Sequence, residues 1–221
     1  MKTKLCLLFT LVLCNSLQAE VKMETLSVSM RDGVKLATDV YRDDAVTQAP
    51  VVLIRTPYDR TKQKGIAERW VKAGYVFVAQ DCRGTKASEG VIAPYNNEGQ
   101  DGFDTIEWVT RQPWSNGRVG MVGGSYVGAV QWQAAVENPP GLAVIAPQAT
   151  WSSFYRNLYL GGAVRLSLIS GWLAGNTPKP EGVTPADMNA ALMRLPLSDV
   201  DEAMGWPMPI LPDGETIREL I

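Results

Sequence analysis

The chain has 221 residues, of which 46% are hydrophobic and 20% are charged, a composition typical of a globular protein rather than a disordered one. Its formal net charge of −2 is spread over interspersed acidic and basic residues, without the basic stripe that would bind a run of phosphates. Nucleic acid is therefore excluded as an expected partner.

The first 19 residues have the pattern of a secretory signal peptide. Two lysines precede an apolar run from Leu5 to Cys14, and the small residue Ala19 follows. Because the run is shorter than the roughly 20 apolar residues that cross a membrane core, no stable membrane anchor is expected. We expect cleavage near Ala19 and a secreted or periplasmic protein; an anchoring helix is the alternative. The mature chain would keep Cys82 as its only cysteine and form no internal disulfide.

Strand and helix patterns alternate in the next part of the chain. Asp32-Gly33 separates two runs of alternating apolar and polar residues and predicts a β-hairpin. Beyond it, β-branched runs typical of buried strands alternate with segments of helical spacing. The expected strands are 50–58, 75–81, 118–123 and 142–149, and the expected helices are 62–74, 101–112 and 126–138. This order predicts an α/β fold, a mostly parallel sheet flanked by helices.

The composition changes after residue 150. Aromatic and apolar residues at helical spacing begin at Trp151, and a Pro/Gly-rich stretch covers 175–185. We therefore expect a distinct helical unit at 151–221, which leaves 20–150 as part of the sheet-containing domain.

Ser125 lies between an expected strand and an expected helix, within the sequence Gly-Gly-Ser-Tyr-Val-Gly (123–128). A serine at such a turn projects its hydroxyl above the sheet edge, and N–H groups at the helix start can stabilise an oxyanion. The common pattern is G-x-S-x-G, whereas here Val127 takes the second position after the serine. By itself the turn is equally typical of a packing or phosphate-binding loop. A dinucleotide site is disfavoured because G-x-G-x-x-G is missing.

Four segments taken together resemble one protein family: RTPYDR (55–60), QDCRGTKASEG (80–90), DGFDTIEWVTRQPWSNGRVGM (101–121) and GGSYVGAVQWQAA (123–135). In order and spacing they are similar to the cocaine-esterase, α-amino-acid ester hydrolase and Xaa-Pro dipeptidyl-peptidase group. That group's elbow reads G-x-S-Y-x-G, which this sequence matches. The resemblance, over residues 25–220, implies an α/β-hydrolase fold with the start of a helical cap at 151–221.

The resemblance also implies roles for three residues. Ser125 would be the nucleophile, and the oxyanion hole would combine the backbone N–H of Tyr126 with the phenolic O–H of Tyr58. The substrate would be a small-molecule ester or amide, or a short peptide, and neither metal nor cofactor would be needed. A packing role at the strand end is the alternative for Tyr58.

Other polar and aromatic residues have simpler explanations. Structural ion pairs and caps are expected of three charged residues beside strand ends: Asp81, Arg83 and Asp101. Packing is expected of three tryptophans: Trp108, Trp114 and Trp132. Cys82 is expected to behave as a small hydrophobic residue rather than a reactive thiol.

The sequence lacks the base that would take the proton of Ser125. In the family this base is a histidine held by an aspartate, and the chain contains no histidine. The resemblance implies that both residues follow the cap. We therefore expect a truncated fragment that is inactive alone and exposes an apolar sheet edge. A lysine base is the alternative, and Lys179 is the only lysine after Ser125.

The expected substrate class depends on charge. No acidic residue occurs from Asn138 to Pro180. Because a buried ammonium group needs a paired carboxylate, the sequence favours an acyl group without a free amine. Xaa-Pro dipeptides are the alternative substrate class, and a non-catalytic binding protein on the same scaffold is the alternative function.

Overall fold

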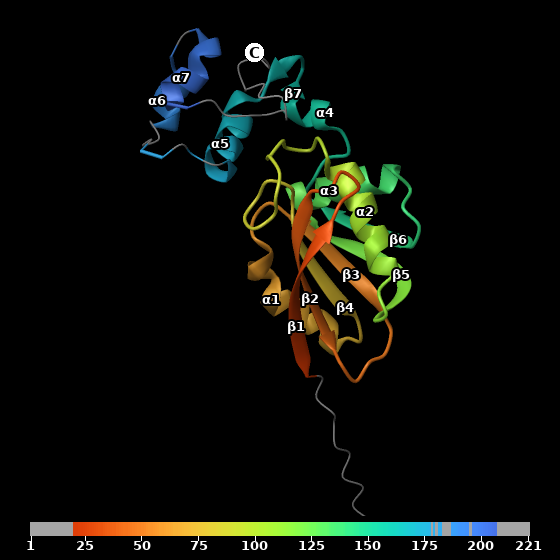
Figure 1. Cartoon of the computed structure of the whole chain (residues 1–221). Helices are drawn as coiled ribbons and strands as arrows, with labels where there is room; N and C mark the ends of the chain where they lie inside the picture. Colours follow the sequence, from red (N-terminus) through yellow and green to blue (C-terminus); the bar gives the residue numbers. More distant parts are fainter. Residues whose placement is uncertain (1–19, 178, 180, 183–186, 195, 207–221) are drawn as a thin grey trace, which may run out of the picture.

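The computed structural model describes residues 20–177, 179, 181–182, 187–194 and 196–206. The expected signal peptide (1–19) and the tail (207–221) lie outside these residues. A six-stranded sheet with helices on both faces forms most of the described chain, and the later helices gather beyond one end of it (Figure 1). None of the described helices is long and apolar enough to cross a membrane.

The first two strands form the expected hairpin, β1 (Val21–Ser29) and β2 (Lys35–Asp43). Gly33 has φ 88°, a conformation that glycine adopts without strain, and its N–H donates to the Met30 carbonyl at 2.9 Å. The hairpin prediction from Asp32-Gly33 is confirmed.

The rest of the sheet is parallel. It contains β3 (Ala49–Thr56), β4 (Val76–Asp81), β5 (Ser115–Gly124) and β6 (Leu142–Gln148), and the spatial order is β1-β2-β4-β3-β5-β6. β4, β3, β5 and β6 pair in parallel, whereas β1 and β2 run antiparallel to their neighbours. The prediction of a mostly parallel sheet is confirmed.

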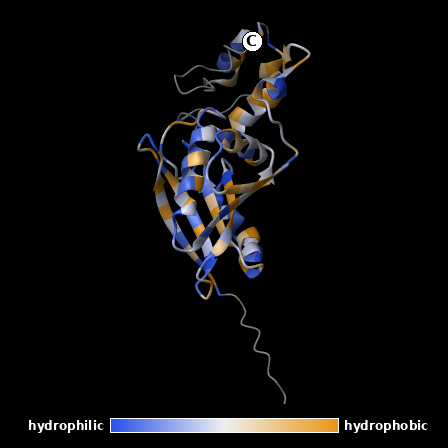
Figure 2. Cartoon of the chain, turned by 90° about the vertical axis from the view of Figure 1, so that its right-hand side faces the viewer, coloured by the Kyte–Doolittle hydropathy of each residue, from blue (hydrophilic) through white to orange (hydrophobic). Residues whose placement is uncertain are grey.

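Three helices cover the two faces of the sheet. They are α1 (Lys64–Lys72), which follows the short 3-10 helix η1 (Arg60–Gln63), α2 (Glu98–Thr110) and α3 (Tyr126–Val136). Val71 of α1 packs in one cluster with Phe77, whereas Ile106 of α2 and Val130 of α3 pack in another with Leu53. Hydrophobic residues run along the strands and the inner sides of these helices (Figure 2).

Helix α2 begins three residues before the expected start at Asp101. The earlier start places Glu98 in the buried first turn, where its carboxylate pairs with the guanidinium of Arg55 at 2.7 Å. The spacing of apolar residues does not indicate this helix start, because Glu98, the residue that fixes it, is charged.

A helical unit follows residue 150. Its elements are α4 (Phe154–Leu158), the strand pair β7 (Tyr159–Leu160) and β8 (Ala163–Val164), α5 (Leu166–Asn176), α6 (Met188–Leu192), the 3-10 helix η2 (Leu197–Asp199) and α7 (Val200–Met204). Leu173, Met204 and Trp206 belong to its separate hydrophobic cluster. The small hairpin was not expected. It turns at Gly161 and Gly162, whose φ values are 62° and 87°.

Strand β6 is one of the two edge strands of the described sheet. Its side chains are unusually accessible for a parallel strand, and Val144 is 60% exposed. Nearby on α3, Trp132 is 39% exposed and thus only partly packed, whereas Trp108 and Trp114 pack edge to face with ring centroids 6.0 Å apart. The described residues therefore show the apolar sheet edge that the sequence led us to expect.

Candidate active site

Ser125 lies at the sharp turn between β5 and α3. Its backbone has φ 58° and ψ −128°, which is strained for a residue with a side chain. The surrounding backbone holds this conformation: the Ser125 N–H donates to the Gln148 carbonyl at 3.0 Å, and the Thr150 hydroxyl donates to the Ser125 carbonyl at 2.7 Å. The side chain is exposed, so the turn presents an accessible hydroxyl above the end of the sheet.

Glycines on both sides of Ser125 make the turn possible. A Cβ on Gly123, whose φ is 134°, would lie 2.3 Å from a methyl group of Val127. A Cβ on Gly128 would lie 2.7 Å from Cγ2 of Thr150, the residue that holds the Ser125 carbonyl. The close approach to Thr150 at Gly128 explains why this elbow has a glycine three residues after the serine.

Tyr126 anchors the first turn of α3. Its hydroxyl donates to Oε1 of Glu98 at 2.9 Å and accepts from the N–H of Tyr95 at 3.1 Å. Burial, together with the neighbouring Glu98 carboxylate, raises the pKa of this phenol well above its usual value, so it stays protonated. No acceptor for the Tyr126 backbone N–H occurs among the described residues, which leaves this helix-start donor available.

Tyr58 follows β3 and lies against Tyr126, with ring centroids 6.5 Å apart. Nε1 of Trp172, on α5, donates to the Tyr58 hydroxyl at 3.1 Å. Because an indole N–H can only donate, the Tyr58 oxygen is the acceptor and its own proton remains for another partner. Trp172 also stacks on Tyr126, with centroids 5.3 Å apart and planes 8° apart. One tryptophan of the helical unit thus contacts the side chains of both residues that are predicted to form the oxyanion hole.

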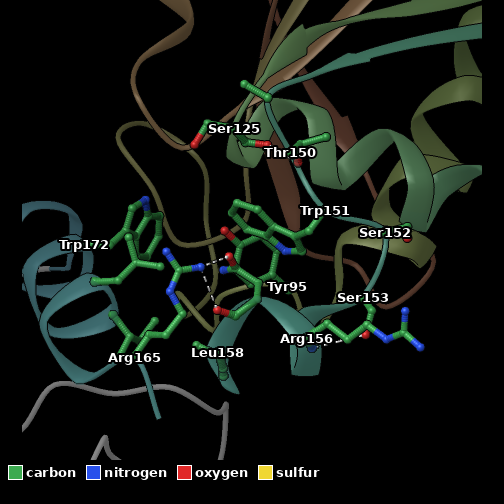
Figure 3. A pocket seen from close by; sticks show the side chains of 14 residues that line it. Tyr95, Ser125, Thr150, Trp151, Ser152, Ser153, Arg156, Leu158, Arg165 and Trp172 are labelled. Atoms are coloured by element: carbon green, nitrogen blue, oxygen red, sulfur yellow. Dashed lines mark hydrogen bonds between the residues drawn. The ribbon is translucent and has the colours of Figure 1, made fainter. Parts of the chain in front are cut away.

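A cavity of about 610 Å³ opens beside Ser125 (Figure 3). Its walls are Ser125, Tyr95, the segment 149–153, and parts of α4 and α5 that include Trp172. Within the described chain, Tyr58 does not line this cavity but lies next to Trp172, which does. The structure thus brings Ser125, Tyr126 and Tyr58 into one region, while their catalytic roles stay predictions.

Buried ion pairs support this region of the structure. Arg55, which has no exposed surface, approaches Glu98 at 2.7 Å and Asp101 at 3.7 Å. Arg83 donates to both oxygens of Asp101, at 2.6 and 3.0 Å, and Arg60 pairs with Asp81 at 2.6 Å. Three of these six residues, Arg55, Asp81 and Asp101, are at most 1% exposed, so the network is part of the core.

The expectation that Asp81, Arg83 and Asp101 form structural ion pairs is confirmed. Cys82 is buried, and burial raises the pKa of its thiol, as expected of a small packed residue and not of a nucleophile. Lys179, the alternative base, lies over the ring of Trp206 and is not part of the cavity wall in the described chain.

Sequence reasoning missed three residues that shape the site. Tyr95 stacks on Tyr126 with ring centroids 4.2 Å apart. Trp172 donates a hydrogen bond to the Tyr58 hydroxyl, and Thr150 donates one to the Ser125 carbonyl. Tyr95 lies in a loop and Trp172 in an unusually apolar helix, so neither has a periodicity that distinguishes it from a packing residue. Only the fold shows that they meet.

A serine held at a strained strand-to-helix turn above a mostly parallel sheet has the backbone geometry of the turn that carries the nucleophile in α/β-hydrolases. The model of one family, X-Pro dipeptidyl-peptidase (S15 family), matches residues 32–205. The chain belongs to this family.

Similar proteins agree with this assignment. The chain is 43% identical over 155 residues to the cocaine esterase of Rhodococcus sp. (strain MB1 Bresler), a match that covers 66% of this chain and 27% of that protein. A solved structure of α-amino acid ester hydrolase superimposes with a TM-score of 0.69 and 27% identity, covering 86% of this chain and 36% of that one. A CocE/NonD family hydrolase from Staphylococcus aureus superimposes with a TM-score of 0.64 and 29% identity, covering 70% and 33%. The match spans about a quarter of the curated relative's length.

Proposed function

We propose that the protein containing this chain is a serine hydrolase that cleaves an ester or amide through an acyl-enzyme on Ser125. The observation that carries the proposal is the strained turn at Ser125, which hydrogen bonds hold in place and which exposes the serine hydroxyl beside a cavity. The family membership and the identity with cocaine esterase support it.

The proposed reaction uses three groups of this chain. The Ser125 oxygen attacks the carbonyl carbon, and its proton passes to a base and then to the leaving group as the ester or amide bond breaks. The Tyr126 N–H and the Tyr58 O–H stabilise the negative charge on the former carbonyl oxygen. Water then attacks the acyl carbon and gives a proton to the base; the bond to the Ser125 oxygen breaks, this oxygen takes the proton from the base, and the acid is released.

The base is the group that this chain does not supply. The sequence has no histidine, and the lysine alternative, Lys179, lies over Trp206. We propose that the base comes from residues outside these 221, and that the chain alone is inactive. The exposed outer edge of β6, where Val144 is 60% exposed, is a surface on which further strands would pair.

The lining of the cavity bears on the substrate. In the described chain it contains no aspartate or glutamate, whereas a substrate with a free amine needs a carboxylate to pair with its ammonium group. We therefore propose an ester or amide whose acyl group lacks a free amine. Xaa-Pro dipeptides are the second candidate, supported by the family description.

The two ends of the chain also have proposed roles. We propose that residues 151–221 are part of a helical cap, since α4 and α5, which lie in this range, form the cavity wall opposite the sheet. We also propose that residues 1–19 direct export, which a fusion of this segment to a reporter active only outside the cytoplasm would test.

The function is tested with the complete open reading frame that contains this chain. Purified protein should hydrolyse p-nitrophenyl butyrate, and Ser125→Ala should abolish the activity, while Tyr58→Phe should lower kcat about a hundredfold or more through loss of one oxyanion donor. Retained hydrolysis in Ser125→Ala would contradict the proposal. Saturable ester binding without hydrolysis would instead favour a binding protein, the reading that the missing histidine supports.

A further inference from the structure

The cavity beside Ser125 has an unbalanced charge. Two arginines, Arg156 and Arg165, contribute to its wall, and no carboxylate does so among the described residues. The imbalance extends to the surrounding sequence, because residues 138–180 contain two arginines and one lysine but no acidic residue. A cavity of this kind attracts anions and repels cations.

Arg165 is the arginine that faces the cavity. It precedes α5, and its backbone N–H donates to the Leu158 carbonyl at 2.7 Å, which fixes the start of its side chain. Figure 3 shows its guanidinium group beside Trp172 and Tyr95, whereas the side chain of Arg156 extends away from both. Arg165 is solvent-exposed, so a ligand in the cavity can reach it.

The guanidinium group of Arg165 has spare donors. Its Nη1 donates to the backbone and side-chain oxygens of Asn157, at 3.3 and 3.4 Å, which are long contacts with neutral acceptors. Within the described chain its Nε and Nη2 have no hydrogen-bond partner. By contrast, Arg31 and Arg83 each form charged hydrogen bonds to carboxylates at 2.6–3.2 Å.

A free guanidinium edge fits a carboxylate, because its parallel N–H groups match the two oxygens. The first turn of α5 lies next to Arg165 and adds partial positive charge from the helix dipole. An ammonium group placed in the same cavity would meet only like charge. A cavity with this lining would favour anionic over cationic ligands.

We propose that Arg165 binds a carboxylate carried by the substrate, so that the preferred substrates are esters or amides with an acidic group away from the scissile bond. This inference rests on the proposed function only in that it places the reacting carbonyl at Ser125. The carboxylate can belong to the acyl part or to the leaving group, and the two cases differ in which ester binds.

The test measures binding and needs no turnover. The Ser125→Ala form of the chain is titrated with monomethyl glutarate, its isosteric primary amide and methyl 5-aminopentanoate, and the fluorescence of the cavity tryptophans reports binding. Parallel titration with 4-acetoxybutanoate places the carboxylate on the leaving-group side. We expect one of the two acids to bind about tenfold more tightly than the neutral amide, and the ammonium ester to bind most weakly.

Variants assign the preference to Arg165. In Arg165→Gln the acid and the amide should bind equally, whereas Arg165→Lys should keep part of the preference and Arg69→Gln, a surface control on α1, should keep all of it. Far-UV circular dichroism confirms that each variant is folded. The inference is overturned if neither acid binds more tightly than the amide, if the preference survives in Arg165→Gln, or if Arg156→Gln removes it instead. If the complete protein shows no Ser125-dependent hydrolysis, the proposed function is wrong. The preference of Arg165 for a carboxylate would still stand, because it is measured by binding alone.

Discussion

The buried pair of Arg55 and Glu98 gives the sharpest prediction about stability. Arg55 has no exposed surface and the Glu98 side chain is 5% exposed, so Glu98→Gln would leave a buried guanidinium group without its nearest counter-charge. Asp101 lies 3.7 Å away, but both of its oxygens already accept from Arg83. Removing one partner of such a pair costs about 3–5 kcal/mol, a large part of the 5–15 kcal/mol that typically stabilises a domain.

The assay is urea unfolding of the purified chain, followed by tryptophan fluorescence. Glu107→Gln is the matched control, because Glu107 pairs with Arg111 at the surface of α2, where the two side chains are 33% and 69% exposed. A surface pair of this spacing contributes only about 0.3–0.5 kcal/mol. If Glu98→Gln lowers the free energy of unfolding by less than about 1 kcal/mol, the pair is not a structural support of the elbow.

Three further predictions concern the site and the sheet edge. Trp172→Phe keeps the stacking on Tyr126 but removes the donor to Tyr58, so kcat/KM of the complete protein should fall about threefold to tenfold, and this loss should disappear in a Tyr58→Phe background. Cys82, whose pKa is raised by burial, should react with a thiol reagent only after unfolding, even at mildly alkaline pH. Val144→Lys places a charge on the exposed outer strand and should reduce aggregation of the isolated chain, measured by light scattering.

Each of these three predictions has an outcome that would contradict it. Equal losses from Trp172→Phe with and without the Tyr58 hydroxyl would mean that the tryptophan acts only through packing. Rapid labelling of Cys82 in the native chain would mean that the core opens locally. Unchanged light scattering in Val144→Lys would mean that association involves another surface.

The sheet and its helices were predictable because their signals are local. Continuous β-branched runs defined β3 and β4, and Asp32-Gly33 defined the first hairpin. The small strands β7 and β8 were missed because they contain two residues each, too few for a period-2 pattern. Their turn at Gly161-Gly162 was the only available signal.

Candidate site residues were predictable only where they belong to a short sequence motif. Ser125 and Tyr126 are adjacent in the elbow, and Tyr58 follows a strand that the resemblance identifies. Trp172 and Arg165 reach the same region from the helical unit, and their roles depend on how that unit lies on the sheet. Long-range placement of this kind has no signature in a single sequence, since any apolar helix can supply a packing tryptophan.

We propose Ser125 as the activated nucleophile of the protein. The most direct test is labelling of the complete protein with a fluorophosphonate probe, followed by peptide mass spectrometry, in the wild type and in Ser125→Ala. We predict one labelled residue, Ser125, and no labelling of the variant. Labelling of the wild type at another residue, or equal labelling of the variant, would show that Ser125 is not the nucleophile.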